Sequence, residues 1–408
     1  MKDETATTRN PRVGFVVQRA GTEVNGGAEA HCLQVAQRMS GHWNTEVLTT
    51  CALDYMTWEN YYPEGVEEVD GTTIRRFPVD VPRNVAAFNR LSEELHARQT
   101  NATLAEQEAW MRAQGPVSTP LLNYLRAQAP SYEAFVFFGY LYASSYFGLP
   151  LVQNKACLAP LAHDEWTIYF SMWDSFFDSP KTLIFNSTAE RDFLRKRFPD
   201  LGLEGPVIGV GIEPPMEIEP ERFRSRNGIR GPFLLYVGRV DESKGCATMF
   251  DYFIRWKSEG GGPHKLVLLG TEVMPIPFHD DIVHLGFVGD DDKWGAMSAC
   301  DWLLMPSPHE SLSMALLETW SVGRPALVNG SCDVLTSHCR QSHGGLWYDN
   351  FGEWSAALSI ADEDMKKALG RQGQAYVRRC YSWERVEHDY LTLLNYETNV
   401  SGGVSRYR

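Results

Sequence analysis

The chain has 408 residues, of which 43% are hydrophobic and 22% charged, and this ordinary mixture excludes a disordered, collagen-like or coiled-coil protein. The formal net charge is −14, from 38 basic and 52 acidic residues, and neither half of the chain is basic. Because phosphate neutralisation needs clustered Lys and Arg, this charge argues against nucleic acid as a partner. It also weakens the case for tight docking on an anionic membrane.

The distribution of apolar residues and cysteines points to the cytoplasm. No apolar run approaches the ~18 residues of a membrane-spanning helix, and the polar N-terminus lacks the apolar region of a signal peptide. The eight cysteines are scattered without a CxxC pair, so we expect reduced thiols. Cys332 and Cys339 could form a disulfide or a metal pair, but we favour free thiols here as well.

Short apolar runs alternate with amphipathic stretches along the first half of the chain, which is typical of βα units and a parallel sheet. The stretch 89–128 is polar and helical in character, and we expect two helices there. We predict strands at 13–17, 46–50, 135–138, 158–162 and 182–185, and helices at 28–39 and 188–198.

A proline-rich segment, 206–220, precedes a second βα series and is the best linker candidate. Two such series predict an α/β fold with two Rossmann-like domains facing each other across a cleft, where ligands bind at the carboxyl ends of strands. We expect domains at 1–212 and 213–380, with a closing helix, 381–398, packed back on the first domain. The strands of the second series are predicted at 233–237, 266–269, 282–285, 302–305 and 326–329.

A glycine pair, Gly26 and Gly27, lies between the first predicted strand and the first predicted helix. Glycines there let backbone N–H groups approach a phosphate at the helix N-terminus. The loop is neither GxGxxG nor a P-loop, and a simple tight turn is the alternative.

Two cations follow the first strand of the second series. Arg239 lies in the loop and Lys244 opens the next predicted helix. A guanidinium fork and an ammonium point charge near the end of a strand suit a diphosphate. The alternative is a pair of solvated charges beside Asp241 and Glu242.

Two glutamates, Glu310 and Glu318, stand eight residues apart with a helical apolar stretch between them. We expect Glu310 at or before a helix N-terminus, which would favour an anion beside it, and Glu318 about two turns in. Carboxylates at such different depths cannot share one bond as an acid/base pair. They suit different parts of one long polar ligand.

The stretch His163-Asp164-Glu165 could supply a general base with orienting carboxylates, or it could be an exposed helix start. The aromatic segment 137–147, with Tyr140 and Tyr142, could stack on sugar faces or pack beneath the site.

Acidic runs at 280–281 and 290–292 superficially resemble metal-binding motifs. We interpret 290–292 as the cap and first-turn charge of a helix, and we expect no metal site. We expect His338 and His343 on a surface loop.

Together these motifs resemble those of GT-B-fold, retaining glycosyltransferases of family 4. The resemblance is carried by the Glu310/Glu318 pair, by Arg239 and Lys244, by the glycine pair and by His-Leu-Gly-Phe-Val at 284–288. A bacterial subset is closest, on EVNGGAE at 23–29, AHDE at 162–165, ESLSM at 310–314 and the C-x6-C-R stretch at 332–346.

The resemblance implies transfer of a hexosyl-type sugar, with retention and without a metal or other cofactor, from a nucleotide-diphosphate sugar, weakly a UDP-sugar, to an acceptor hydroxyl. It implies that Arg239 and Lys244 bind the donor diphosphate. Many members carry Phe-Gly where this chain has Leu312-Ser313, so a serine hydroxyl could contact the donor where others use a backbone N–H. The other implied residues are His163 near the reacting sugar, Glu310 at the sugar hydroxyls, Glu318 at the ribose, Phe287 and Val288 at the nucleobase, Gly26 and Gly27 at phosphate, and Ser311 and Met314 at the donor; Asp164, Glu165, Tyr140 and Tyr142 are acceptor candidates.

Two other functions stay open: a GT-B nucleotide-sugar epimerase or hydrolase, and a non-catalytic partner subunit. The acceptor could be a glycan, a lipid-linked compound or a small molecule. A lipid-linked acceptor would need a peripheral membrane face, for which the mixed-charge helix 190–198 is one candidate and an ordinary solvated face the alternative.

Overall fold

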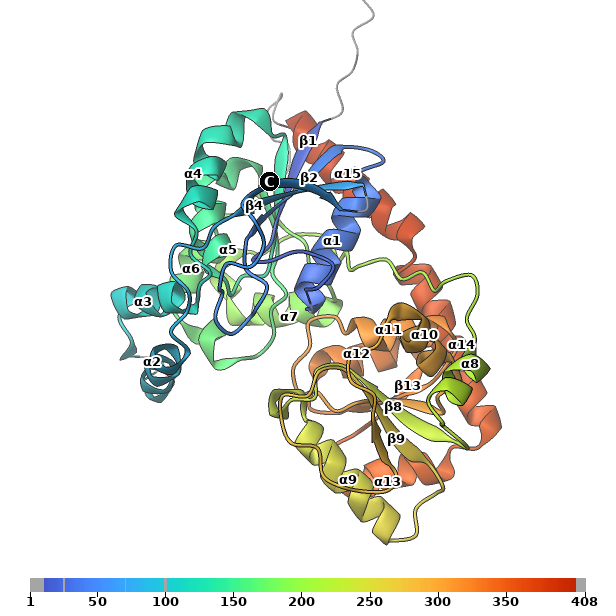
Figure 1. Cartoon of the computed structure of the whole chain (residues 1–408). Helices are drawn as coiled ribbons and strands as arrows, with labels where there is room; N and C mark the ends of the chain where they lie inside the picture. The colour runs from blue at the N-terminus through green and yellow to red at the C-terminus, as the bar shows by residue number, and fades with distance from the viewer. Residues whose placement is uncertain (1–10, 25, 70, 99–100, 401–408) are drawn as a thin grey trace, which may run out of the picture. The chain divides into compact units, whose positions relative to one another are not determined.

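The computed structural model describes residues 11–24, 26–69, 71–98 and 101–400, with the backbone alone for 395–400 (Figure 1). The described residues divide into two compact units. Unit 1 takes those within Met1–Asn186, Glu190–Ile208 and Glu387–Arg408, and unit 2 takes Ser187–Ala189 and Gly209–Val386. The main passage from one unit to the other therefore lies at 208–209, inside the proline-rich segment.

In the described part of unit 1, seven strands form one sheet in the order β3-β4-β2-β1-β5-β6-β7. All neighbouring strands are parallel except β3 and β4, which form an antiparallel hairpin at one edge. We did not predict this hairpin, because β3 is a charged edge strand with mostly exposed side chains. The strands are β1 (Arg12–Val16), β2 (Asn44–Thr50), β3 (Gly65–Val69), β4 (Thr72–Phe77), β5 (Ala134–Phe138), β6 (Ala156–Ala159) and β7 (Thr182–Leu183).

The stretch expected to hold two helices holds three in the structure, because three separate N-caps interrupt it. The side chains of Asn84, Thr103 and Ser118 each accept a hydrogen bond from a backbone N–H of the turn that follows. The α-helices of this unit before the linker are α1 (Gly27–Met39), α2 (Val85–Ala97), α3 (Leu104–Gln114), α4 (Thr119–Gln128), α5 (Ala143–Gly148), α6 (Met172–Phe177) and α7 (Thr188–Arg197), whose first two residues group with unit 2.

The last helix, α15 (Trp383–Val400), returns to unit 1 from the far end of the chain. Figure 1 shows it beside α1, and Glu387 of α15 lies 3.1 Å from the guanidinium of Arg38 at the end of α1. Tyr390 is fully buried on this helix. Unit 1 is therefore completed by residues that follow unit 2 in the sequence.

In unit 2, six described strands form a wholly parallel sheet in the order β10-β9-β8-β11-β12-β13. Side chains alternate between its two faces: Phe233 and Leu235 of β8 join one apolar cluster, and Leu234 and Tyr236 join the other. The strands are β8 (Phe233–Val237), β9 (Lys265–Leu269), β10 (Ile282–His284), β11 (Trp302–Met305), β12 (Ala326–Asn329) and β13 (Gly345–Tyr348), of which β13 was not predicted.

Helices cover both faces of this sheet. Phe250 of α9 and Trp354 of α13 lie in the apolar cluster of one face, and Leu316 of α11 and Tyr376 of α14 lie in that of the other. The helices of unit 2 are α8 (Pro220–Arg226), α9 (Cys246–Ser258), α10 (Asp290–Ala299), α11 (Met314–Ser321), α12 (Asp333–Ser342), α13 (Phe351–Ile360) and α14 (Glu363–Cys380).

The expected fold class, α/β with two Rossmann-like domains, is confirmed. Within the described residues, no helix is long and apolar enough to cross a membrane.

Candidate functional site

The loops at the carboxyl ends of the unit 2 strands hold many of the residues singled out from the sequence. The loop after β8 and the loop after β11 touch at Gly245, whose φ is +74°. A Cβ at this position would lie 2.3 Å from the carbonyl oxygen of Pro306. Glycine is therefore required for the backbone contact that brings Lys244 close to the loop of Glu310.

Lys244 and Glu310 form an ion pair, with Nζ and Oε1 2.8 Å apart and the Glu310 side chain only 14% exposed. The sequence predicted Lys244 at the start of the next helix, and this is not the case. Lys244 ends a short 3-10 turn, Glu242–Lys244, and α9 begins at Cys246. The turn is capped by Asp241, which accepts from the Ser243 N–H. This cap fixes the turn that ends in Lys244.

Arg239 joins the same group through Asp241, with Nε and Oδ2 2.9 Å apart. Burial opposes ionisation of Asp241, but hydrogen bonds from Ser243 and the charges of Arg239 and Lys244 outweigh it and lower its pKa. The guanidinium is 44% exposed, so it can still reach a ligand in solvent. The structure thus links Arg239, Lys244 and Glu310 in one charged group, in which both cations act on Asp241 and Lys244 also pairs with Glu310.

Glu310 lies before the N-terminus of its helix, as expected, and the segment after it is not helical until Met314. Ser313 is the N-cap residue, with φ 68° and ψ 79° in the left-handed region, and its side chain makes no cap. Its hydroxyl is buried and finds no hydrogen-bond partner among the described residues. Leu312 is buried in the core, whereas Ser311 is partly exposed.

Glu318 lies inside α11, as expected, and is 8% exposed. Burial raises its pKa, and Lys293 of α10 partly counteracts this across an Nζ–Oε1 distance of 3.0 Å. We did not foresee this partner from the sequence. Lys293 also lies 3.2 Å from Asp290. The acidic run 290–292 forms the first turn of α10, as expected, but the N-cap residue is Gly289 and not an aspartate.

Phe287 and Val288 follow β10 at the same edge of the sheet. Phe287 is 69% exposed, and Val288 packs partly against the core. Met314, at the first position of α11, is partly buried as well. An exposed ring at this edge is free to contact a ligand.

In unit 1, the glycine pair begins α1, with Gly26 as N-cap and Gly27 as the first helical residue. Glu29 folds back over this end: a Cβ on Gly26 would lie 2.1 Å from Glu29 Oε2, and Oε1 lies 2.6 Å from Nε of the buried Arg19. By contrast, a Cβ on Gly27 would meet nothing within 4 Å. Packing therefore explains why residue 26 is a glycine, but it does not explain why residue 27 is one.

The His163 loop follows β6, at the carboxyl edge of the unit 1 sheet. His163 is partly buried, and Asp164 is exposed and accepts a hydrogen bond from Tyr169 OH at 2.8 Å. Glu165 accepts from Tyr140 OH at 2.7 Å. The structure therefore ties both carboxylates to tyrosines of the same unit.

Tyr140 cannot serve as a stacking surface, because it is 1% exposed. Its ring packs on those of Trp173 and Phe177, with centroids 4.7 and 5.7 Å away. Packing beneath the surface, the alternative weighed for this segment, is its role. Tyr142 is partly exposed, and its ring lies edge-on to Trp58 at 5.9 Å.

His338 does not lie on a surface loop, and that prediction is wrong. It is a buried residue of α12, with Nδ1 3.0 Å from Tyr376 OH, and burial lowers its pKa to about 4. The helical spacing of Leu335, His338 and Cys339 could have revealed this face. His343 is exposed in a left-handed conformation just after the helix.

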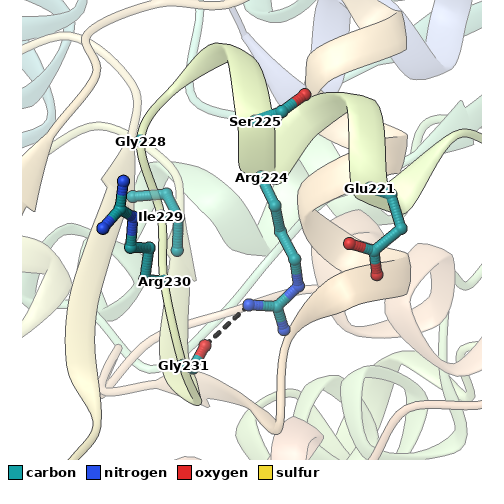
Figure 2. A pocket seen from close by; sticks show the side chains of 7 residues that line it. All are labelled: Glu221, Arg224, Ser225, Gly228, Ile229, Arg230 and Gly231. Carbon is teal, nitrogen blue, oxygen red and sulfur yellow. Dashed lines mark hydrogen bonds between the residues drawn. The ribbon is translucent and has the colours of Figure 1, made fainter.

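A surface hollow of about 790 Å³ lies at the opposite, amino end of β8 (Figure 2). Figure 2 shows the guanidinium of Arg224 directed at the carbonyl of Gly231, 2.6 Å away. None of the residues expected at the functional site lines this hollow, so we do not assign the site to it. The lining residues are Glu221, Arg224, Ser225, Gly228, Ile229, Arg230 and Gly231.

All eight cysteines are free thiols, Cys332 and Cys339 included. In the part of the chain that the structure describes, no group of three or more His, Cys, Asp or Glu side chains is arranged to hold a metal ion.

In the comparison with known proteins, the match to a protein family lies in unit 2. Residues 231–358, which contain Arg239, Lys244, Glu310 and Glu318, match the family described as "Glycosyl transferases group 1". A 2-deoxystreptamine glucosyltransferase from Streptomyces kanamyceticus is 29% identical over 136 residues, which are 29% of this chain and 34% of that protein. The chain spans about a third to a half of the length of the curated relatives it matches.

Solved structures match nearly the whole chain. Sucrose-phosphate synthase from Thermosynechococcus elongatus has a TM-score of 0.71 at 15% identity, covering 96% of this chain and 100% of that one. The Anabaena HepE protein in complex with UDP-glucose has a TM-score of 0.65 at 12% identity, covering 95% and 100%. At such identities the likeness establishes the fold, and this chain has the two-domain α/β fold of GT-B glycosyltransferase structures.

Proposed function

We propose that this protein is a glycosyltransferase that moves a sugar from a nucleotide-diphosphate sugar to an acceptor hydroxyl. The observation that carries the proposal is the group formed by Arg239, Asp241, Lys244 and Glu310 at the carboxyl edge of the unit 2 sheet. It lies inside the segment that matches the glycosyl transferases group 1 family. A non-catalytic scaffold has no need of such a group.

The two cations would bind the donor diphosphate. Arg239 offers a fork of N–H donors, and Lys244 keeps two further N–H groups besides the one directed at Glu310. The N-terminus of α11, with the buried hydroxyl of Ser313, adds a positive dipole end and a donor. Glu310, held by Lys244, would accept hydrogen bonds from the sugar hydroxyls.

The rest of the donor would extend along the same edge of the sheet. Glu318 is oriented by Lys293 and would accept hydrogen bonds from the ribose hydroxyls. The exposed ring of Phe287 and the backbone of Val288 would contact the nucleobase. Solved structures of the same fold include complexes with UDP-glucose and UDP, which makes UDP-glucose the first donor to test.

For the chemistry we propose transfer with retention of anomeric configuration. The bond from the anomeric carbon to the diphosphate oxygen breaks while the acceptor oxygen bonds to the same face, and the acceptor proton passes to the departing phosphate oxygen. Arg239 and Lys244 would stabilise the negative charge that develops on the diphosphate. With these cations in place we expect turnover to withstand a chelator such as EDTA.

Unit 1 would bind the acceptor, through the loop of His163, Asp164 and Glu165 and the partly exposed Tyr142. The acceptor class stays open among glycans, lipid-linked compounds and small molecules. The candidate membrane helix α7 is poorly suited to a lipid face, since Arg195 pairs with Glu204 and Arg197 donates to the Ile168 carbonyl. The eight free thiols support a reducing compartment such as the cytoplasm.

The test is a thermal-shift panel with UDP, GDP, ADP and TDP and their common sugar conjugates. A ligand at 100 times its Kd stabilises the fold by ~2.7 kcal/mol, which moves the midpoint visibly. We expect a shift with one nucleotide family that is lost in Lys244→Ala and kept in Lys367→Ala, an exposed lysine on α14 of the same unit.

The panel also separates the competing functions. Absence of any shift would contradict the donor site and favour a partner subunit. A shift followed by consumption of the sugar nucleotide without an acceptor would instead identify an epimerase or a hydrolase.

A further inference from the structure

Glu190 is a buried glutamate of α7 whose carboxylate serves two places far apart in the sequence. It is 1% exposed. Oε2 accepts from the backbone N–H of Asn186 at 2.6 Å and from its Nδ2 at 3.0 Å, which caps the start of α7. Oε1 accepts from the backbone N–H of Ala162 at 2.7 Å, 28 residues away.

The loop that receives this second contact needs an anchor. It leaves β6 at Ala159 and passes through Leu161, a non-glycine residue with φ 56°. A left-handed backbone is strained in a residue with a side chain, and it persists only where the surroundings hold it. The bond from Ala162 to a buried carboxylate is such a restraint, and the next residue is His163.

If Glu190 only stabilised the fold, a buried carboxylate would be an unfavourable side chain, because burying its charge costs free energy. Burial raises its pKa to about 7, although N–H donors from Asn186, Ala162 and Leu161 act in the opposite direction. A buried charge needs every one of these donors, so it forces them into one geometry. A neutral side chain would fill the same volume without imposing that geometry on the loop.

We propose that Glu190 is a positioning residue that fixes the loop 160–163 and so sets where His163 stands. The role of His163 at the reacting sugar rests on the proposed function, whereas the anchoring of the loop does not. The signal was absent from the sequence, where Glu190 is one of several charges on an amphipathic helix.

The test combines hydrogen exchange with turnover, using Glu190→Gln and Glu190→Asp. Gln keeps the size but turns an N–H group toward N–H donors, and Asp keeps the charge but is shorter by about 1.5 Å. We expect exchange of the peptide 160–164 to rise at least tenfold while β1 and β5 stay protected. With UDP-glucose as donor, kcat should fall at least tenfold and the donor KM should change less than threefold, with Asp intermediate.

Glu106→Gln is the matched control, because Glu106 also caps a helix of unit 1, accepting from the Thr103 N–H at 2.8 Å, and its other partner is Arg98, 2.9 Å away. It should leave both readouts unchanged.

Unchanged exchange at 160–164 in a folded Glu190 variant would overturn the proposal, as would loss of protection across the whole of unit 1, which would show a purely structural role. If Glu190→Gln does not fold, Glu190→Asp decides. If the wild-type protein transfers no sugar, the proposed function fails while the exchange measurement still decides the anchor.

Discussion

Gly26 and Gly27 are adjacent, but different structural constraints act at the two positions. At Gly26 a side chain would collide with the carboxylate of Glu29, which is held by Arg19. At Gly27 there is open space, and the residue begins a helix, where alanine is the better residue. A ligand that approaches the backbone would explain why this position carries no side chain.

Gly27→Ala should therefore raise the free energy of unfolding by roughly 0.5–1 kcal/mol, because alanine loses less conformational entropy in a helix. The same substitution should weaken binding of UDP-glucose at least fivefold if a phosphate approaches the N–H of this residue. Thermal melts and titration calorimetry measure the two effects. Gly26→Ala is the contrasting variant, expected to lower stability; undiminished binding by Gly27→Ala would remove this loop from the donor site.

Ser313 combines a strained backbone with a buried hydroxyl that has no partner among the described residues. Ser313→Gly should relieve the strain and raise stability by about 1 kcal/mol. Because it also deletes the hydroxyl, it should weaken donor binding. Ser313→Ala removes the hydroxyl and keeps the strain, so equal loss of affinity in both variants would assign the effect to the hydroxyl, and unchanged affinity in both would assign Ser313 no contact with the donor.

Helix α12 illustrates an element that the sequence analysis missed. Its apolar positions recur at helical spacing, but a histidine among them was assigned to a surface because histidine is usually polar and hydrated. The buried ring of His338 instead packs among Trp320, Tyr376 and Tyr381. A neutral imidazole in this place makes the helix sensitive to acid.

The pKa of His338 falls from its ordinary 6.5 to about 4 in the fold. The stability that the neutral ring preserves is complete above pH 6.5 and is lost as the pH falls toward 4, by about 3 kcal/mol in total. His338→Phe should flatten this part of the stability curve, at the cost of the hydrogen bond between His338 and the Tyr376 hydroxyl. Urea unfolding between pH 4 and pH 7 measures the free energy of unfolding of both proteins, and hydrogen exchange in α12 is a second readout. The same pH dependence in the wild type and the variant would refute the depressed pKa of His338.

Other elements were missed or misplaced for identifiable reasons. The hairpin β3–β4 escaped prediction because an exposed edge strand needs no apolar pattern. Glu318 lies nearer the start of its helix than the two turns expected, because the left-handed Ser313 delays the start of α11 to Met314. Strand positions in the second series were close to the observed bounds, since both faces of a parallel sheet are buried and each strand is a continuous apolar run.

At the scale of the whole molecule, unit 1 includes most of α15, a helix that follows unit 2 in the sequence. A chain ending at Val386 lacks the contacts of Glu387 and Tyr390 with unit 1 but keeps the sheet of unit 2. We expect it to lose hydrogen-exchange protection in β1 and α1 while β8 and β11 stay protected. Equal loss in both units would show that they unfold together, and no loss would show that α15 contributes little.

The sequence by itself determined the α/β class, the two βα series and the loops at which the candidate donor residues stand. It could do so because buried parallel strands are written as local apolar runs, and because parallel topology brings their carboxyl ends to one edge. Only the tertiary structure decided the partners: Lys244 with Glu310, Lys293 with Glu318, and Glu190 with the backbone of Ala162. These contacts join residues far apart in the chain, and packing, not local pattern, decides which of many charged side chains meet.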